Sequence, residues 1–93
     1  MAEATYEGIV VDAAEKAGWV VRKLRWIGRR NGPDRFFAKD GRVVLLEFKR
    51  PGESARTGQD KEITALKEAG VEAHVVDNHL KALRILGVPY AAA

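Results

Sequence analysis

Three charged side chains are notable for their type and spacing: Asp34, and the pair Glu47 and Lys49, which are separated by one residue. In a β-strand, residues two apart point to the same face, so Glu47 and Lys49 are expected to emerge side by side. They directly follow the apolar run 43–46. Burying such a pair is costly unless the charges are matched or a metal is bound. The pair therefore indicates a functional site rather than a contribution to core stability.

A predicted hairpin brings Asp34 to the same place. The Asp-Gly pair at 40–41 is a strong signal for a tight turn between two strands. Pairing Lys39 with Arg42 across this turn places Asp34 opposite Glu47. Two carboxylates brought together in this way form a hard-oxygen site suited to Mg²⁺ or Mn²⁺.

Apolar periodicity and turn residues predict the elements that position these side chains. The run at 42–49 is apolar on both faces, which is typical of a central strand covered on both sides. The order is α-β-β-β-α-β-α, and the fold class is α/β with one mixed β-sheet flanked by helices. The expected elements are a helix over 4–17, strands over 19–26, 35–39 and 42–49, a helix over 57–69, a strand over 71–76 and a helix over 78–86. The apolar stripe of the first helix is expected at Tyr6, Val10, Ala13 and Ala17. Asn78 and Gly87 are the expected ends of the last helix.

Length and composition describe one small globular domain, expected over residues 1–89 with a short tail at 90–93. Apolar residues make up 46% of the 93 residues and charged residues 31%, which is ordinary for a folded protein. The chain has no cysteine, which excludes disulfides and thiolate zinc sites. It has no run long enough to cross a bilayer and no signal-peptide pattern at its start, so a cytoplasmic location away from membranes is expected.

A basic stretch carries an aromatic residue and no acid between Lys16 and Asp34. Together with Trp26, these positive charges suit a phosphate backbone. A solvated strand and loop that are rich in Lys and Arg remain an equal alternative. The basic residues proposed to contact nucleic acid are Arg22, Lys23, Arg25, Arg29, Arg30 and Arg50.

Pro33-Asp34 followed by Glu47-Phe48-Lys49 resembles the PD-(D/E)XK nuclease motif. The wider set of residues resembles the VRR-NUC branch of that superfamily in its stand-alone phage or bacterial form, and the resemblance runs over nearly the whole chain. The residues that carry this wider resemblance are Gly32-Pro33-Asp34, Glu47, Lys49, Pro51-Gly52, Gln59 in the second helix and Glu7 in the first.

The resemblance implies a restriction-endonuclease-like core and metal-dependent hydrolysis of DNA phosphodiester bonds. Asp34, Glu47 and the main-chain carbonyl of Phe48 would hold Mg²⁺ or Mn²⁺, and Lys49 would orient or help to deprotonate the attacking water. Glu7 would complete the metal site directly or through water. Gln59 would hydrogen-bond Lys49 or the attacked phosphate. Simple solvation on a helix is the alternative for both Glu7 and Gln59.

The resemblance also implies an assembly, because the stand-alone family members that are similar to this chain act as symmetric dimers and resolve branched DNA. A homodimer that acts on four-way junctions is therefore expected here. Trp19 or Trp26 and the last helix, 80–86, are the candidates for an apolar dimer interface. Two alternatives remain: a nucleic-acid-binding module of the same fold without catalysis, and a monomeric nuclease that cuts flaps or nicks one strand.

Overall fold

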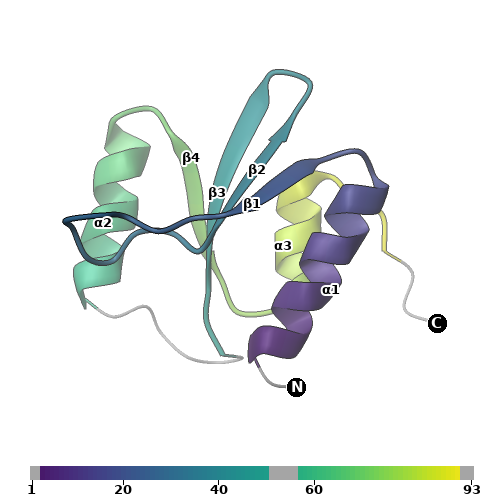
Figure 1. Cartoon of the computed structure of the whole chain (residues 1–93), viewed down its shortest axis with the longest axis horizontal. Helices are drawn as coiled ribbons and strands as arrows, with labels where there is room; N and C mark the ends of the chain where they lie inside the picture. The colour runs from purple at the N-terminus through teal and green to yellow at the C-terminus, as the bar shows by residue number, and fades with distance from the viewer. Residues whose placement is uncertain (1–2, 51–56, 91–93) are drawn as a thin grey trace.

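The computed structural model describes residues 3–50 and 57–90, with side chains described from Tyr6 to Arg50 and from Asp60 to Tyr90. The elements follow the predicted order, α-β-β-β-α-β-α (Figure 1). They are α1 (Glu3–Lys16), β1 (Val20–Lys23), β2 (Arg35–Lys39), β3 (Arg42–Phe48), α2 (Thr57–Glu68), β4 (Glu72–Val76) and α3 (His79–Leu86).

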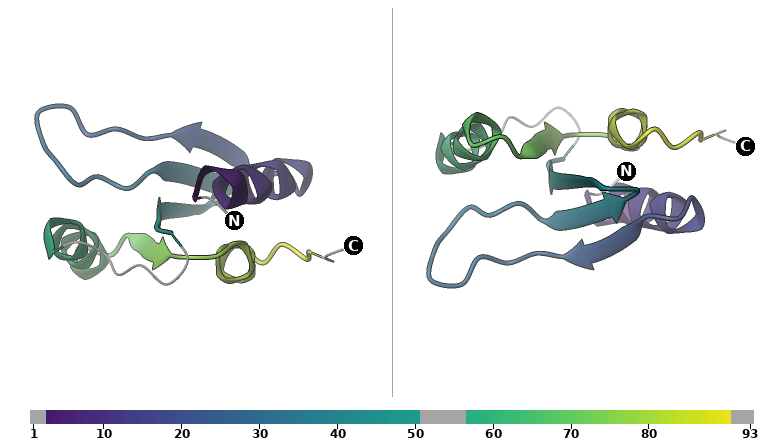
Figure 2. Two further views of the ribbon diagram at one scale, coloured as in Figure 1. Left: turned by 90° about the horizontal axis from the view of Figure 1, so that it is seen from below. Right: turned by 90° about the horizontal axis from the view of Figure 1, so that it is seen from above.

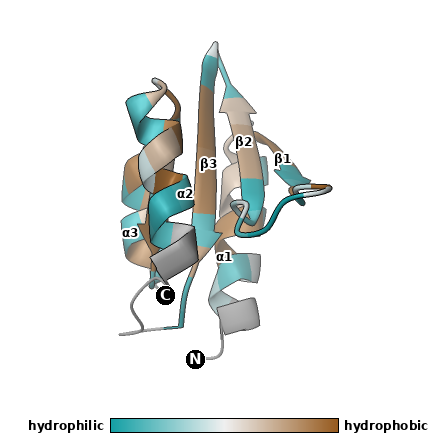
Figure 3. Cartoon of the chain, turned by 90° about the vertical axis from the view of Figure 1, so that its left-hand side faces the viewer, coloured by the Kyte–Doolittle hydropathy of each residue, from teal (hydrophilic) through white to brown (hydrophobic). Residues whose placement is uncertain are grey.

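The strands form one mixed sheet in the order β1-β2-β3-β4. β2 and β3 pair antiparallel with Lys39 opposite Arg42, which confirms the predicted register of the hairpin. The turn between them has positive φ at Asp40 (49°) and Gly41 (80°), which suits an Asp-Gly pair. β3 and β4 pair parallel across the helical crossover through α2. β3 is therefore an inner strand, as predicted, and Figure 3 shows it as hydrophobic over most of its length.

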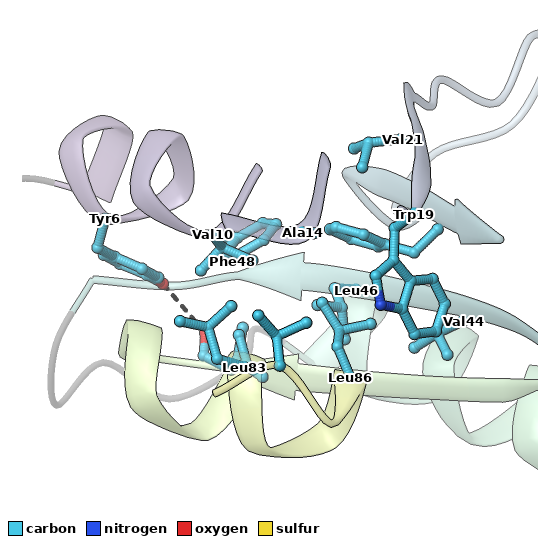
Figure 4. Close-up of a cluster of buried hydrophobic side chains, with 14 residues drawn as sticks. Tyr6, Val10, Ala14, Trp19, Val21, Val44, Leu46, Phe48, Leu83 and Leu86 are labelled. Carbon is cyan, nitrogen blue, oxygen red and sulfur yellow. Dashed lines mark hydrogen bonds between the residues drawn. The ribbon is translucent and has the colours of Figure 1, made fainter. Parts of the chain in front are cut away.

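Helices cover both faces of the sheet (Figures 1 and 2). α1 and α3 lie together on one face, where alternate β3 residues Val44, Leu46 and Phe48 join the larger apolar cluster. Figure 4 shows this cluster between the helices and the sheet. α2 lies on the other face, where Leu45 of β3 packs with Ile63 and other apolar side chains. Within α1 the buried stripe includes Ala14 rather than the expected Ala13, which is only partly buried.

The last helix has both of its predicted ends. The Asn78 side chain accepts a hydrogen bond from the N–H of Lys81 at 2.8 Å, which satisfies one of the free donors of the first turn. Gly87 closes the helix in the left-handed conformation with φ 68°. On its inner face Ala82, Leu83 and Leu86 are buried.

One sequence prediction was wrong, and another loses some of its residues. The first strand was expected over 19–26, but β1 is limited to Val20–Lys23 because Trp19 turns into the core and residues 24–34 form a long loop. Of the candidates for a dimer interface, Trp19 is 6% exposed within its own chain, and Trp26 is partly buried. Ala82, Leu83 and Leu86 of α3 pack against α1 and the sheet, and Leu80 is left 52% exposed.

Across residues 3–50 and 57–90, no helix has the length and apolar character needed to cross a membrane.

Candidate active site

The Glu47–Lys49 pair lies at the end of β3, on the face that α2 covers. Alternation along β3 places both side chains on the same face as Leu45. Glu47 is 3% exposed and Lys49 6% exposed, and they are the buried charged residues of the described core. The Lys49 Nζ lies 3.1 Å from the Glu47 Oε2. The two charges are therefore matched, as the sequence analysis required of a buried pair.

Asp34 lies directly before β2, whose pairing with β3 ends at Arg35 opposite Leu46. The main-chain N–H of Asp34 donates to the Leu46 carbonyl at 2.9 Å, one residue out of that register. Its Oδ2 accepts a hydrogen bond from the N–H of Phe48 at 2.8 Å. The Asp34 carboxylate is thus fixed against the backbone between Glu47 and Lys49.

Burial raises the pKa of Asp34 above its ordinary value of 3.8, and the nearby Glu7 carboxylate raises it further. The hydrogen bond from Phe48 and the positive charge of Lys49 act in the opposite direction, but the raised pKa shows that desolvation dominates. A cation bound at this carboxylate would favour its charged form. The carboxylates of Asp34 and Glu47 are the oxygen donors here that could hold a hard divalent ion.

Glu7 has a partner that the sequence analysis did not foresee. The Nε of Arg35 donates to the Glu7 Oε2 at 2.6 Å, with both side chains largely buried. Alternation explains the contact, because Arg35 follows Asp34 and points to the opposite face, toward α1. The signal was available in the sequence as an Arg on the helix-facing side of β2. Within the described part of the chain no cluster of three or more potential metal-ligating side chains forms, and the metal-binding role of Glu7 stays a prediction.

A second residue missed by sequence reasoning is Tyr6. It was assigned to the apolar stripe of α1, and its ring does pack in the core against Phe48. Its hydroxyl, however, donates to the main-chain carbonyl of Lys49. It also lies 3.1 Å from the Val76 carbonyl, the contact drawn as a dashed line in Figure 4. The N–H of Lys49 in turn donates to the same Val76 carbonyl at 2.8 Å. α1 thereby fixes the backbone that carries the candidate catalytic lysine.

The loop of residues 24–34 is docked against α2. The indole Nε1 of Trp26 donates to the Glu62 Oε2 at 2.5 Å, and the Arg29 guanidinium lies 3.3 Å from the other oxygen of Glu62. Gly32 lies directly against the Trp26 ring: a Cβ at this position would come within 2.7 Å of the indole. The glycine before Pro33-Asp34 is therefore required by close packing, and the docked loop leads directly into Asp34.

The predicted nucleic-acid-binding residues are solvent-exposed, consistent with either of the readings left open by the sequence. They are Arg22, Lys23, Arg25, Arg29, Arg30 and Arg50. Gln59 belongs to the first turn of α2 by its backbone, but its side chain lies outside the described part, as do Pro51 and Gly52. His74 lies within β4 with its Nε2 3.3 Å from Glu72, consistent with a structural role.

Comparison with known proteins identifies the fold. No protein-family model matches the sequence, and no curated protein matches it. Among solved structures, a chain described as a VRR_NUC domain superposes with a TM-score of 0.84 at 22% sequence identity. The match covers 95% of this chain and 97% of the other. The chain therefore has the fold of a VRR_NUC domain, which confirms the fold that the motif resemblance implied.

Proposed function

We propose that the protein is a metal-dependent endonuclease that hydrolyses phosphodiester bonds in DNA. The observation that carries this proposal is the buried Glu47–Lys49 pair beside Asp34 at the end of an inner strand. A nucleic-acid-binding module of the same fold has no need to desolvate two charges in this way, since burying them is costly. The fold of a VRR_NUC domain supports the same conclusion.

Asp34, Glu47 and the main-chain carbonyl of Phe48 are the groups that would hold Mg²⁺ or Mn²⁺. Such an ion would polarise the phosphate and lower the pKa of a water molecule. Glu7 would bind the ion directly or through water while one of its oxygens stays paired with Arg35. These assignments rest on oxygen donor chemistry and on the pairing of β2 with β3.

Lys49 would act on the attacking water and on the phosphate. Its ammonium is buried beside Glu47, so its position is defined by both the ion pair and the fixed backbone of the strand end. It would orient or help to deprotonate the water and offset negative charge as the water oxygen bonds to phosphorus. The bond from phosphorus to the 3′-oxygen breaks, the proton passes to that oxygen, and the products are a 5′-phosphate and a 3′-hydroxyl.

The proposed substrate is branched DNA, with two copies of the chain acting on a four-way junction. A second candidate, a monomeric nuclease that nicks or cuts flaps, is favoured by one observation: Trp19 and the inner face of α3 are buried within the protomer. A dimer must then use other surfaces. Exposed apolar side chains remain at Val20, Val43 and Leu80.

The test is a cleavage assay with supercoiled plasmid, a four-way junction and a flap, each with Mg²⁺, with Mn²⁺ and with a chelator. The expected result is metal-dependent cleavage that Asp34→Asn abolishes. This substitution keeps an oxygen that can accept the hydrogen bond from the Phe48 N–H. DNA binding without cleavage in either metal would support the binding module instead. Light scattering with and without the junction separates a dimer from a monomer.

A further inference from the structure

Ile27 is an apolar side chain held almost entirely in water. It is 96% exposed, the highest value among the large apolar residues in the described part of the chain. The other exposed members of this class range from 40% to 52% and lie elsewhere on the fold: Val20, Val43, Leu80 and Tyr90. A single exposed isoleucine needs no explanation by itself. Its support and its surroundings are what distinguish Ile27.

Ile27 follows a residue that is anchored to the rest of the fold. Its neighbour Trp26 is anchored to α2 by the hydrogen bond to Glu62 and packs directly against Gly32. Beyond Ile27 the chain turns back through Gly28, at φ 79°, and Asn31, at φ 67°. Figure 1 shows the resulting loop extending past α2, away from α1 and α3. The isoleucine therefore projects from an anchored base into solvent.

The surroundings of Ile27 are positively charged. Arg25, Arg29 and Arg30 are exposed on the same loop, and Lys61 is exposed on α2. Arg29, Arg30 and Lys61 help to line a hollow of about 310 Å³ between the loop and the helix, together with one acid, Glu62, which pairs with Arg29. Two copies of the chain meeting at Ile27 about a two-fold axis would bring like charges together. A polyanion is therefore a better occupant than a second protomer.

We propose that Ile27 is an apolar wedge that inserts where the base stacking of DNA is interrupted, while the surrounding cations contact the flanking phosphates. Apolar side chains inserted at base steps unstack and kink DNA, and the cost of unstacking is smallest where pairing or stacking is already broken. This inference rests on the proposed nuclease function and gives its substrate class: DNA with a break in stacking, as at a branch point, in preference to continuous duplex.

The loop also gives the wedge a defined relation to the candidate site. Residues 24–34 end at Asp34, and the main-chain N–H of Leu24 donates to the Asp34 carbonyl at 2.9 Å. The base of the loop is thus closed at the backbone of Asp34. DNA held by the wedge would be positioned relative to Asp34 through this short, doubly attached segment.

The test measures binding without cleavage, in chelator, to a four-way junction and to a continuous duplex of the same total length. A fluorescent adenine analogue at the branch reports unstacking. With Ile27→Ser we expect the preference for the junction to fall about tenfold, which corresponds to about 1.4 kcal/mol. The increase in fluorescence on binding should be lost, and duplex affinity should change little. Ile27→Leu should keep both signals, and Tyr90→Ser, at an exposed position outside the loop, should affect neither.

Several outcomes would overturn the wedge. One is an unchanged junction preference in Ile27→Ser, and another is an equal loss of affinity for both DNAs. A third is a change in self-association of Ile27→Ser in the absence of DNA, which would assign the residue to contact between copies. Cleavage by the unaltered chain is measured separately in Mg²⁺. The two proposals are therefore tested independently: the wedge can be rejected while cleavage is observed. Cleavage can also be absent while the binding preference for the junction is observed.

Discussion

The two faces of the sheet differ in what they bury. The face under α1 and α3 holds a large cluster of apolar side chains, from Tyr6 and Val10 of α1 to Leu83 and Leu86 of α3. The face under α2 has a much smaller cluster around Leu45 and Ile63, and beside it lie the buried charges of Glu47 and Lys49. Apolar burial is the main source of stability. The first face therefore stabilises the domain, and the second has room for chemistry that costs stability.

The largest effect is expected from a substitution that breaks the charged pair on the α2 face. Glu47→Gln should lower cleavage by about 10²–10³-fold. It should also destabilise the fold by about 3–5 kcal/mol, because the buried Lys49 ammonium loses its counter-charge. Adding Lys49→Met should restore stability but not cleavage. Denaturant unfolding and a nicking assay on the same three proteins measure both quantities. A double variant that regained cleavage would contradict the roles given to the pair.

A substitution on the face under α1 and α3 should lower stability and leave cleavage almost unchanged. Leu83→Ala removes a side chain that is 1% exposed in the larger cluster. We expect a loss of about 2–5 kcal/mol in the free energy of unfolding. Well below the melting temperature, cleavage per folded molecule should stay within about twofold of the unaltered chain, because α3 supplies no proposed site residue. Leu80→Ala, at an exposed position of the same helix, is the control.

Arg35 points toward α1 but directly follows Asp34 in the chain, and its substitution should have an intermediate effect. Arg35→Ala frees the Glu7 carboxylate from the ion pair that positions it. Removal of such an outer partner usually weakens metal binding or activity by about 10–100-fold. Calorimetry with Mn²⁺ should show a lower affinity or fewer ions bound per chain. Arg35→Lys should recover part of the lost affinity. Unaltered Mn²⁺ affinity and cleavage in Arg35→Ala would make the ion pair purely structural.

A smaller effect is expected in the pH dependence of stability. The pKa of Asp34 is raised in the folded state, so the stability that this group contributes is full below about pH 3.8 and is lost as pH rises through the folded pKa. Asp34→Asn does not titrate. Its stability relative to the unaltered chain should therefore increase over that range and then level off. Urea unfolding from pH 3 to pH 7 gives the difference curve, and a flat or falling curve would contradict the assigned cause.

The smallest expected effect lies at the far end of the sheet. Arg42 makes two hydrogen bonds to Glu72, at 2.6 and 2.9 Å, and these lower the pKa of Glu72. The pair is partly exposed, so Glu72→Gln should cost about 0.5–1 kcal/mol at neutral pH. Because the folded pKa is lowered, this contribution should vanish as pH falls through it. Cleavage should not change.

Local signals in the sequence predicted the parts of the fold that depend on local chemistry. The Asp-Gly turn at 40–41 set the register of the hairpin, and Asn78 and Gly87 set the ends of α3. The position of Asp34 at the end of the hairpin that carries Glu47 followed from that register. These features depend on neighbours in sequence, so one chain is sufficient to predict them.

The features that escaped prediction depend on contacts between distant segments. The alternation at 19–26 suggested a strand, but Trp19 is drawn into the core and Trp26 into a contact with Glu62 on α2. The pairing of Glu7 with Arg35 joins residues that are 28 positions apart. The hydroxyl of Tyr6 binds the carbonyl of Lys49, 43 positions away, although the residue reads as part of an apolar stripe. Periodicity identifies a buried face but does not say which polar atoms meet there.

The contact between Gly32 and the indole of Trp26 has a consequence for how this sequence can change. A methyl group at position 32 would overlap the ring at 2.7–2.9 Å, so alanine there is excluded while tryptophan stays at 26. The two positions are therefore expected to vary as a unit: a side chain smaller than indole at 26 would permit alanine or serine at 32. In a library randomised at both positions and selected for folded protein, glycine at 32 should be enriched wherever tryptophan occupies 26.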